Sequence, residues 1–317
     1  MTSSLPDATL RQATADWLAL PATAADPRLA VLRLSGPDAL TFLQGQATAD
    51  VREITPGTSR LGALLNLKGR IVVAFRALAV DDGYLLVVPA DQLAPLQARL
   101  GKYAVFSKVT LTAADLPVTG LAGRDIAARL ADAGLDVPAA ADAVSRLPEG
   151  WLVRLPGADR FWLLGSATLT GITWPDDGQR EAAYAAWQVR SLMAGEYLPP
   201  AAASEQHQPQ ELDYHTLQGV SYQKGCYLGQ EIVARLYFRG NLKYRLQWLQ
   251  GDWPVAVAPQ PGDTLFSGDD KVGEVISVVW PDARQVGVLG LVRQDSDGAA
   301  LVGEQGPVSL TALPFAR

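Results

Sequence analysis

The sequence has few of the residues that form disulfides and metal sites. Its 317 residues include one cysteine, Cys226, and two histidines, His207 and His215. A single thiol cannot form an intramolecular disulfide, and a zinc site takes three or four protein ligands, most of them Cys or His. We therefore expect no disulfide and no metal site built from this chain's residues alone.

Long apolar runs and a strong net charge are also absent. The longest apolar runs, such as Ile71 to Phe75, have the length of a strand and fall short of the roughly 18 residues of a membrane-spanning helix. The first ten residues lack the basic start and apolar core of a secretory signal. A net charge of −6 argues against broad electrostatic binding to nucleic acid or anionic lipid. With the single cysteine, these absences favour a cytoplasmic protein without direct membrane contact, for which nucleic-acid contact is absent or indirect.

The composition that is present is that of a globular chain with a large core. Hydrophobic residues make up 48% and charged residues 19%, and the length is sufficient for two or three domains. No phosphate-binding loop, dinucleotide fingerprint or Gly-x-Ser-x-Gly nucleophile motif occurs. These familiar classes of enzyme site are therefore not indicated.

Apolar periodicity and turn residues predict an α+β fold that ends in a barrel. The expected helices, the first one with Ser35 as its N-cap, are Ser35 to Leu43, Asp91 to Leu100, Arg124 to Ala133 and Glu181 to Ala194. Strands in a meander separate them: Ala30 to Leu34, Leu61 to Asn66, Ile71 to Val80, Tyr84 to Val88, Trp151 to Leu155 and Arg160 to Leu164. Short strands from Leu242 onward indicate a closed or nearly closed β-barrel: Tyr244 to Leu249, Lys271 to Trp280, Gln285 to Val292 and Val308 to Ala312. We expect domains at 1–115, 116–240 and 241–317, and the boundaries of the first one leave room for a discontinuous module.

Cys226 has the most distinctive surroundings in the chain. Lys224 precedes it, Gly225 and Gly229 flank it, and a helix is predicted from Gln230 to Phe238. A lysine and a helix N-terminus both stabilise a thiolate, and glycine allows positive φ and close approach of another group. The alternative is a buried cysteine that acts as a small apolar side chain. The residues alone leave both interpretations open.

The predicted helix carries charges on one face. Glu231, Arg235 and Arg239 follow each other at i, i+4 and i+8, which is typical of a solvated face. Arg235, Arg239, Lys243 and Arg245 also form the densest positive cluster of the chain, and arginines can hold a carboxylate or phosphate through paired hydrogen bonds. Both interpretations stay open.

The stretch from Lys224 to Glu231 resembles the motif of the YgfZ-type folate-binding proteins, which are similar to the T-protein aminomethyltransferase of the glycine cleavage system. The motif residues are Lys224, Gly225, Cys226, Tyr227, Gly229, Gln230, Glu231, Arg235 and Arg239. The resemblance extends to Ser35 to Ala39, Phe42 to Gln46, Thr48, Asp50, Asn66 to Arg70 and Pro209 to Leu212. It spans most of the chain, except for Leu116 to Glu181.

The resemblance implies a ring of two α+β modules and a small C-terminal β-barrel. It also implies a monomer that binds tetrahydrofolate and helps to assemble or repair iron–sulfur clusters in client proteins, tRNA-modifying radical enzymes among them. Cys226 would be a reactive thiol or a transient cluster ligand, and Lys224 would support its thiolate. A [4Fe–4S] cluster normally takes four cysteines, so any cluster contact would be shared with a partner.

The resemblance also implies where folate binds, and its departures bear on the chemistry. Asn66, Lys68 and Arg70, in a predicted hairpin turn, and Arg190 are the candidate folate contacts, although the turn could equally be two solvated charges. The acidic pair that follows this hairpin in aminomethyltransferases is replaced by Val72-Val73, and no pterin-anchoring glutamate occurs near Arg160 to Gly165. These departures argue against aminomethyl transfer and against a self-standing enzyme.

Two other functions remain possible on the sequence. One is a folate-dependent one-carbon transferase that acts on a small molecule or an RNA base, although the two valines leave it without the expected acid. The other is a non-catalytic scaffold that has lost folate and only docks a partner.

Overall fold

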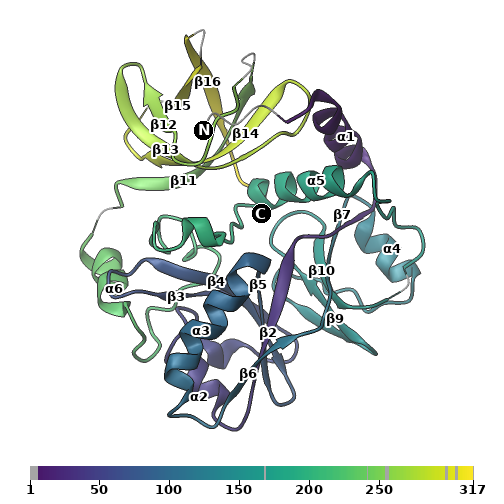
Figure 1. Cartoon of the computed structure of the whole chain (residues 1–317), viewed down its shortest axis with the longest axis vertical. Helices are drawn as coiled ribbons and strands as arrows, with labels where there is room; N and C mark the ends of the chain where they lie inside the picture. The colour runs from purple at the N-terminus through teal and green to yellow at the C-terminus, as the bar shows by residue number, and fades with distance from the viewer. Residues whose placement is uncertain are drawn as a thin grey trace.

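The structure is a computed structural model that describes residues 6–167, 169–240, 242–253, 257–296, 299–303 and 306–316. Figure 1 shows two sheets and a barrel arranged around helix α5 and the segment that leads to helix α6. In this description no helix has the length and apolar character needed to cross a membrane.

The first sheet is antiparallel with the strand order β3-β4-β5-β2-β6. Its elements are β2 (Leu29–Ser35), α2 (Ala39–Gln44), β3 (Ser59–Leu65), β4 (Ile71–Val80), β5 (Gly83–Pro89), α3 (Leu93–Ala104) and β6 (Thr110–Ala114), with short 3-10 turns at Val51–Glu53 and Ala90–Gln92. Side chains alternate between its faces: Val73 and Phe75 pack under α2 and α3, whereas Ala74 faces the centre of the molecule. Both faces are therefore buried, which explains the nearly continuous apolar strands.

The first helix begins later than the sequence predicted. Ser35 ends β2, and Asp38 stands at the N-cap position of α2. The Asp38 carboxylate accepts the Lys108 N–H at 2.7 Å and makes no cap bond. The backbone of Ser35 pairs with Gly83 and Thr110 of the neighbouring strands. Ser35 therefore belongs to β2 and cannot be the N-cap of the helix.

The second sheet has the order β1-β7-β10-β9-β8. Its elements are α1 (Ala8–Ala19), β1 (Thr23–Ala25), β7 (Val118–Ala122), α4 (Ile126–Asp132), β8 (Val144–Leu147), β9 (Gly150–Arg154), β10 (Arg160–Gly165) and α5 (Arg180–Met193). Phe161 faces α4, and Trp162 faces α1 and α5. The division of the chain is thus discontinuous: α1 and β1, which we assigned to the first module by position, join the second sheet because β1 pairs with β7.

The C-terminal strands close into a six-stranded barrel in the order β11-β14-β13-β12-β15-β16. They are β11 (Tyr244–Asp252), β12 (Thr264–Ser267), β13 (Asp270–Val279), β14 (Gln285–Arg293), β15 (Ala299–Gly303) and β16 (Gly306–Leu313). The α+β prediction and the predicted barrel are confirmed. Trp248 of β11 points out of the barrel into the shared core, over Gly287, where a Cβ atom would lie 2.1 Å from its ring.

One apolar core joins the three units. It contains Leu61 of the first sheet, Leu192 of α5, Trp248 of the barrel and Val233 of α6 (Gln230–Arg239). The segment between α5 and α6 crosses this core with little regular structure besides the turn Ala201–Ala203. Its backbone is tied to the first module, because Ser221 N–H donates to the Thr48 carbonyl at 2.9 Å. The chain therefore reaches Cys226 in a fixed position.

Candidate functional site

Cys226 lies on the surface, in the loop before α6. Its thiol is exposed, so the alternative of a buried apolar cysteine is wrong. The loop is fixed where it enters the helix: Tyr227 N–H donates to Gln230 Oε1 and Gln230 N–H to the Tyr227 carbonyl, both at 3.2 Å. The predicted helix begins at Gln230, directly after Gly229. Among the described residues no three His, Cys, Asp or Glu side chains gather into a metal-binding group.

Two glycines bring the β3–β4 hairpin into contact with α6. Gly229 has φ +81°, and a Cβ atom there would lie 2.6 Å from the Asn66 carbonyl oxygen. A Cβ atom at Gly69 would lie 3.0 Å from the Ile232 side chain. Gly225, by contrast, has open space where a Cβ would stand and is not among the residues with positive φ. The expected glycine geometry thus applies to Gly229 and not to Gly225.

Lys224 is buried and bound to backbone carbonyls, and its support of the thiolate stays a prediction. It is 5% exposed, and its ammonium group donates to the carbonyls of Gln44, Ala47 and Ala49 at 2.7, 2.7 and 2.8 Å. These bonds use all three ammonium hydrogens. Burial lowers the pKa of Lys224 to about 8, so the ammonium predominates at pH 7. The residue clamps the motif onto the turn after α2.

Asp50 stabilises the same turn from its other end. Its carboxylate accepts from Arg52 Nε at 2.9 Å and from Gln44 Nε2 at 3.0 Å. Hydrogen bonds from Arg52 lower the pKa of Asp50 to about 2, which outweighs the opposing effect of burial. Gln44 and Asp50 belong to the first stretch of the family resemblance and Lys224 to the last. The structure brings these distant stretches into direct contact.

Helix α6 presents charged and aromatic side chains to solvent. Glu231 and Arg235 are exposed, as are Tyr237 and Phe238. The side chain of Arg239 lies outside the described residues. A solvated face and an anion-binding face both remain compatible with these positions.

The hairpin candidates for folate lie at the tip of β3–β4. Asn66 Oδ1 accepts the N–H groups of Lys68 and Arg70 at 2.9 and 3.0 Å, and its amide donates to Glu205 at 3.1 Å. Arg70 donates to the Glu205 carbonyl at 3.2 Å. Asn66 therefore shapes the turn. Arg190 lies elsewhere: it donates to the Leu18 carbonyl at 2.8 Å, and burial lowers its pKa.

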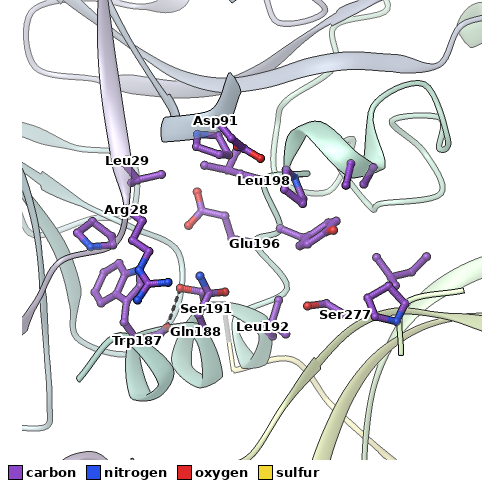
Figure 2. A pocket seen from close by; sticks show the side chains of 18 of the residues that line it. Arg28, Leu29, Asp91, Trp187, Gln188, Ser191, Leu192, Glu196, Leu198 and Ser277 are labelled. Atoms are coloured by element: carbon purple, nitrogen blue, oxygen red, sulfur yellow. Dashed lines mark hydrogen bonds between the residues drawn. The ribbon is translucent and has the colours of Figure 1, made fainter. Parts of the chain in front are cut away.

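A separate cavity of about 800 Å³ opens where the two modules and the barrel meet. Its walls come from Arg28 and Asp91 in the first 115 residues, from Trp187 of α5 and from Glu196 in the segment after α5. Ser277 of the barrel completes them. Figure 2 shows the Glu196 carboxylate projecting into this space, with Arg28, Trp187 and Ser191 on one side and Asp91 and Leu198 on another. Neither the four folate candidates nor the motif residues line this cavity in the part of the chain described. The folate role of those four candidates stays a prediction that the position of the cavity does not favour.

A buried ion network forms one wall of the cavity. Glu196 is 4% exposed and accepts from Arg76 Nη2 at 2.5 Å and from Arg160 Nη2 at 3.5 Å. Burial opposes ionisation of Glu196, but the two arginines outweigh it and hold the pKa of Glu196 below its ordinary value. Burial and repulsion from Arg76 lower the pKa of Arg160 to about 10, despite the attraction of Glu196. All three groups are therefore charged near pH 7, and Arg76 also pairs with Asp142.

Polar atoms without partners mark the same wall. Among the described residues, Arg160 Nε and Trp162 Nε1 are buried and have no hydrogen-bond partner, and both residues line the cavity. Buried donors of this kind are rare in folded proteins and often indicate a ligand or water. No local motif contains Glu196, Arg160 or Trp162, and a charged residue that the fold buries looks ordinary in the sequence, so these residues were not predicted as part of a site.

The fold and the motif define the class of this protein. The structure resembles the glycine cleavage system aminomethyltransferase T from Bartonella henselae, with a TM-score of 0.73 and 18% identity over 99% of this chain and 94% of that one. The predicted aminomethyltransferase-like ring is thereby confirmed.

Curated relatives give the family. The chain is 33% identical over 302 residues to the tRNA-modifying protein YgfZ of Klebsiella pneumoniae, covering 90% of each. It is 33% identical over 278 residues, 84% of each, to the protein of the same name in Escherichia coli O157:H7. No family model matches the sequence. The chain belongs to the YgfZ family.

Proposed function

We propose that this protein is a cytoplasmic, tetrahydrofolate-binding accessory factor for assembling or repairing iron–sulfur clusters in client enzymes, including radical enzymes that modify tRNA. The single observation that carries this proposal is the exposed Cys226 thiol on a loop fixed by Lys224 and Gly229. An accessible thiol in a preorganised loop can engage a partner's cluster or electrophile, which a buried cysteine cannot. Membership of a family named for tRNA modification supports the client class.

The cavity supports the folate part of the proposal. Its size falls within the range of pockets that hold small molecules. Its wall includes the Glu196 carboxylate, which projects into the space and can accept from the N–H groups of a pterin. Aromatic residues, Trp187 and Tyr184 among them, line the cavity. The residues present therefore fit a pterin with an attached aromatic ring, and bound tetrahydrofolate would supply a reduced pterin that can carry one-carbon units.

One-carbon transfer by this protein is a weaker candidate. Val73 is fully buried under α2 and α3, and Val72 packs against the same cluster. Neither can accept or donate a proton at the position where aminomethyltransferases carry an acidic pair. The partner-docking scaffold differs from our proposal in one respect, since it requires no folate binding.

The test is restoration of client activity in the host from which the gene has been deleted. We expect wild type and the loop control Gln223→Ala to restore the activity of a [4Fe–4S] tRNA methylthiotransferase, measured per amount of client protein. Cys226→Ser should accumulate normally, because exposed substitutions change stability by about 0.5 kcal/mol or less, but should fail to restore activity. Full restoration by the serine variant would remove the thiol from the mechanism.

A further inference from the structure

Three large apolar side chains are exposed on the β3–β4 hairpin tip and on α6, two elements that meet where a Cβ atom at Gly69 would lie 3.0 Å from Ile232. Leu67 is 78% exposed, Tyr237 54% and Phe238 67%. We name Leu67, Tyr237 and Phe238 the α6 patch. Isolated exposed apolar residues are ordinary on protein surfaces, but grouped ones mark interaction sites.

Ring contacts fix Tyr237 and Phe238 of the α6 patch. Tyr237 stacks on Tyr222 with ring centroids 3.8 Å apart, and Phe238 meets Tyr237 edge-on at 4.9 Å. Leu67 stands two residues from Gly69, whose Cα lies 3.4 Å from the Cβ position of Gly229. The two rings are therefore preorganised, which lowers the entropy that a binding partner would have to overcome.

Cys226 lies beside this patch along the chain. It is four residues from Tyr222, which stacks on Tyr237 of the patch. It is three residues from Gly229, which contacts the hairpin that carries Leu67. Four residues span at most about 14 Å. A protein seated on the α6 patch would thus come within reach of the thiol.

The charges around the patch are mainly positive, although the whole chain carries −6. The exposed cations are Lys68 and Arg70 of the hairpin tip, Arg235 of α6 and Lys243, five residues after Phe238, and the exposed acidic side chains are Glu231 of α6 and Glu205, which accepts from Asn66. An aromatic and aliphatic centre with a rim that includes arginine is the composition of a protein interface. Its charge is complementary to an acidic partner.

We propose that the α6 patch docks a folded client protein whose own surface carries an apolar centre with an acidic rim, and that docking presents the client to Cys226. This inference rests on the proposed function and adds where the client binds. A protein fits better than single-stranded RNA, because Leu67 is the most exposed member and offers no face for base stacking. One face of Tyr237 is also already occupied by Tyr222.

The test measures binding of a purified [4Fe–4S] tRNA methylthiotransferase to the full-length protein and its variants. Leu67→Ala/Phe238→Ala removes apolar area from the patch, and Phe106→Ala is the control, because Phe106 is 89% exposed outside the patch. Arg235→Glu/Lys243→Glu reverses rim charge, and Lys102→Glu/Arg124→Glu makes the same change in net charge elsewhere. All of these residues are exposed, so we expect melting temperatures close to that of wild type.

We expect both patch variants to weaken client binding at least tenfold, the controls to leave it unchanged, and added salt to weaken wild type more than the charge-reversed variant. Equal binding by wild type and patch variants would overturn the proposal, as would wild type that restores activity in cells yet does not bind the client. If the patch variants bound the client normally but no longer bound a tRNA anticodon stem-loop, the proposal would also be overturned. The patch would then be an RNA-binding site. Failure of wild type to restore activity would instead contradict the proposed function itself.

Discussion

Lys224 and Cys226 are two residues apart and have opposite surroundings. The lysine is buried and gives its three hydrogens to backbone carbonyls, whereas the cysteine is exposed. Sequence proximity suggested that the charge acts on the sulfur. In the structure the charge acts on the turn after α2, and the thiol owes its position to that turn and to α6.

Replacement of Lys224 by methionine should therefore reduce stability and leave the thiol reactive. The change removes three charge-assisted bonds and leaves buried carbonyls without a partner, which costs about 3 kcal/mol. Thermal unfolding should show a lower melting temperature for the variant. The rate of Cys226 alkylation by iodoacetamide, measured well below that temperature, should stay within about twofold of wild type if no ammonium group assists the sulfur. A large fall in this rate would restore the direct role.

The glycines of the motif provide a matched pair of variants. Gly229→Ala places a Cβ at positive φ and against the Asn66 carbonyl, so we expect a loss of about 1–3 kcal/mol. Gly225→Ala meets no neighbour within 4 Å and should unfold like wild type. Chemical denaturation measures both. Equal stabilities would mean that the hairpin does not hold α6 as described.

At the scale of elements, helices and strands were largely predictable because apolar residues recur in each with the spacing of a helix or of a strand. The hairpin β3–β4, helix α5 and helix α6 follow from alternation or helical spacing and from the turns between them. Helix α1 was missed because its alanine- and threonine-rich sequence has little amphipathic pattern, and β1 because three residues carry no period. Both form through contacts with distant elements, which a local pattern cannot show.

The candidate site divides in the same way. The Cys226 motif is contiguous and was found from the sequence, whereas the cavity wall combines Arg160 and Glu196 from separate elements, with Arg76 paired to Glu196. These three side chains are buried together only once the two modules have packed against each other. The burial of Lys224 could not be predicted for the same reason: its partners, Gln44 to Ala49, are about 180 residues away.

At the scale of the molecule, the network Arg76–Glu196–Arg160 joins the two modules. Arg76 belongs to β4 of the first sheet and Arg160 to β10 of the second, and Glu196 lies between them. Removal of one partner from a buried ion network typically costs about 3–5 kcal/mol. We therefore expect Glu196→Gln to destabilise the whole molecule by about this amount.

This loss should depend on pH with a definite sign. Because the folded pKa of Glu196 lies below its ordinary value of 4.5, the unfolded chain binds more protons between the two values. The stability advantage of wild type over Glu196→Gln should be complete above about pH 5 and should shrink as pH falls through the lowered folded pKa. Urea denaturation at pH 7, 5 and 3.5 measures it. An advantage that does not change over this range would show that the carboxylate is not held ionised by the arginines.

The proposed folate site in the cavity and the Cys226 thiol lie at different places on one molecule, and titration of tetrahydrofolate tests their independence most directly. We predict that calorimetry gives one site per chain with the same affinity in wild type and in Cys226→Ser, because the cavity contains no residue of the motif among those described. Saturating ligand should also raise the melting temperature by several degrees, since 100 times Kd adds about 2.7 kcal/mol. Absence of binding to wild type, or its loss in the serine variant, would contradict the account.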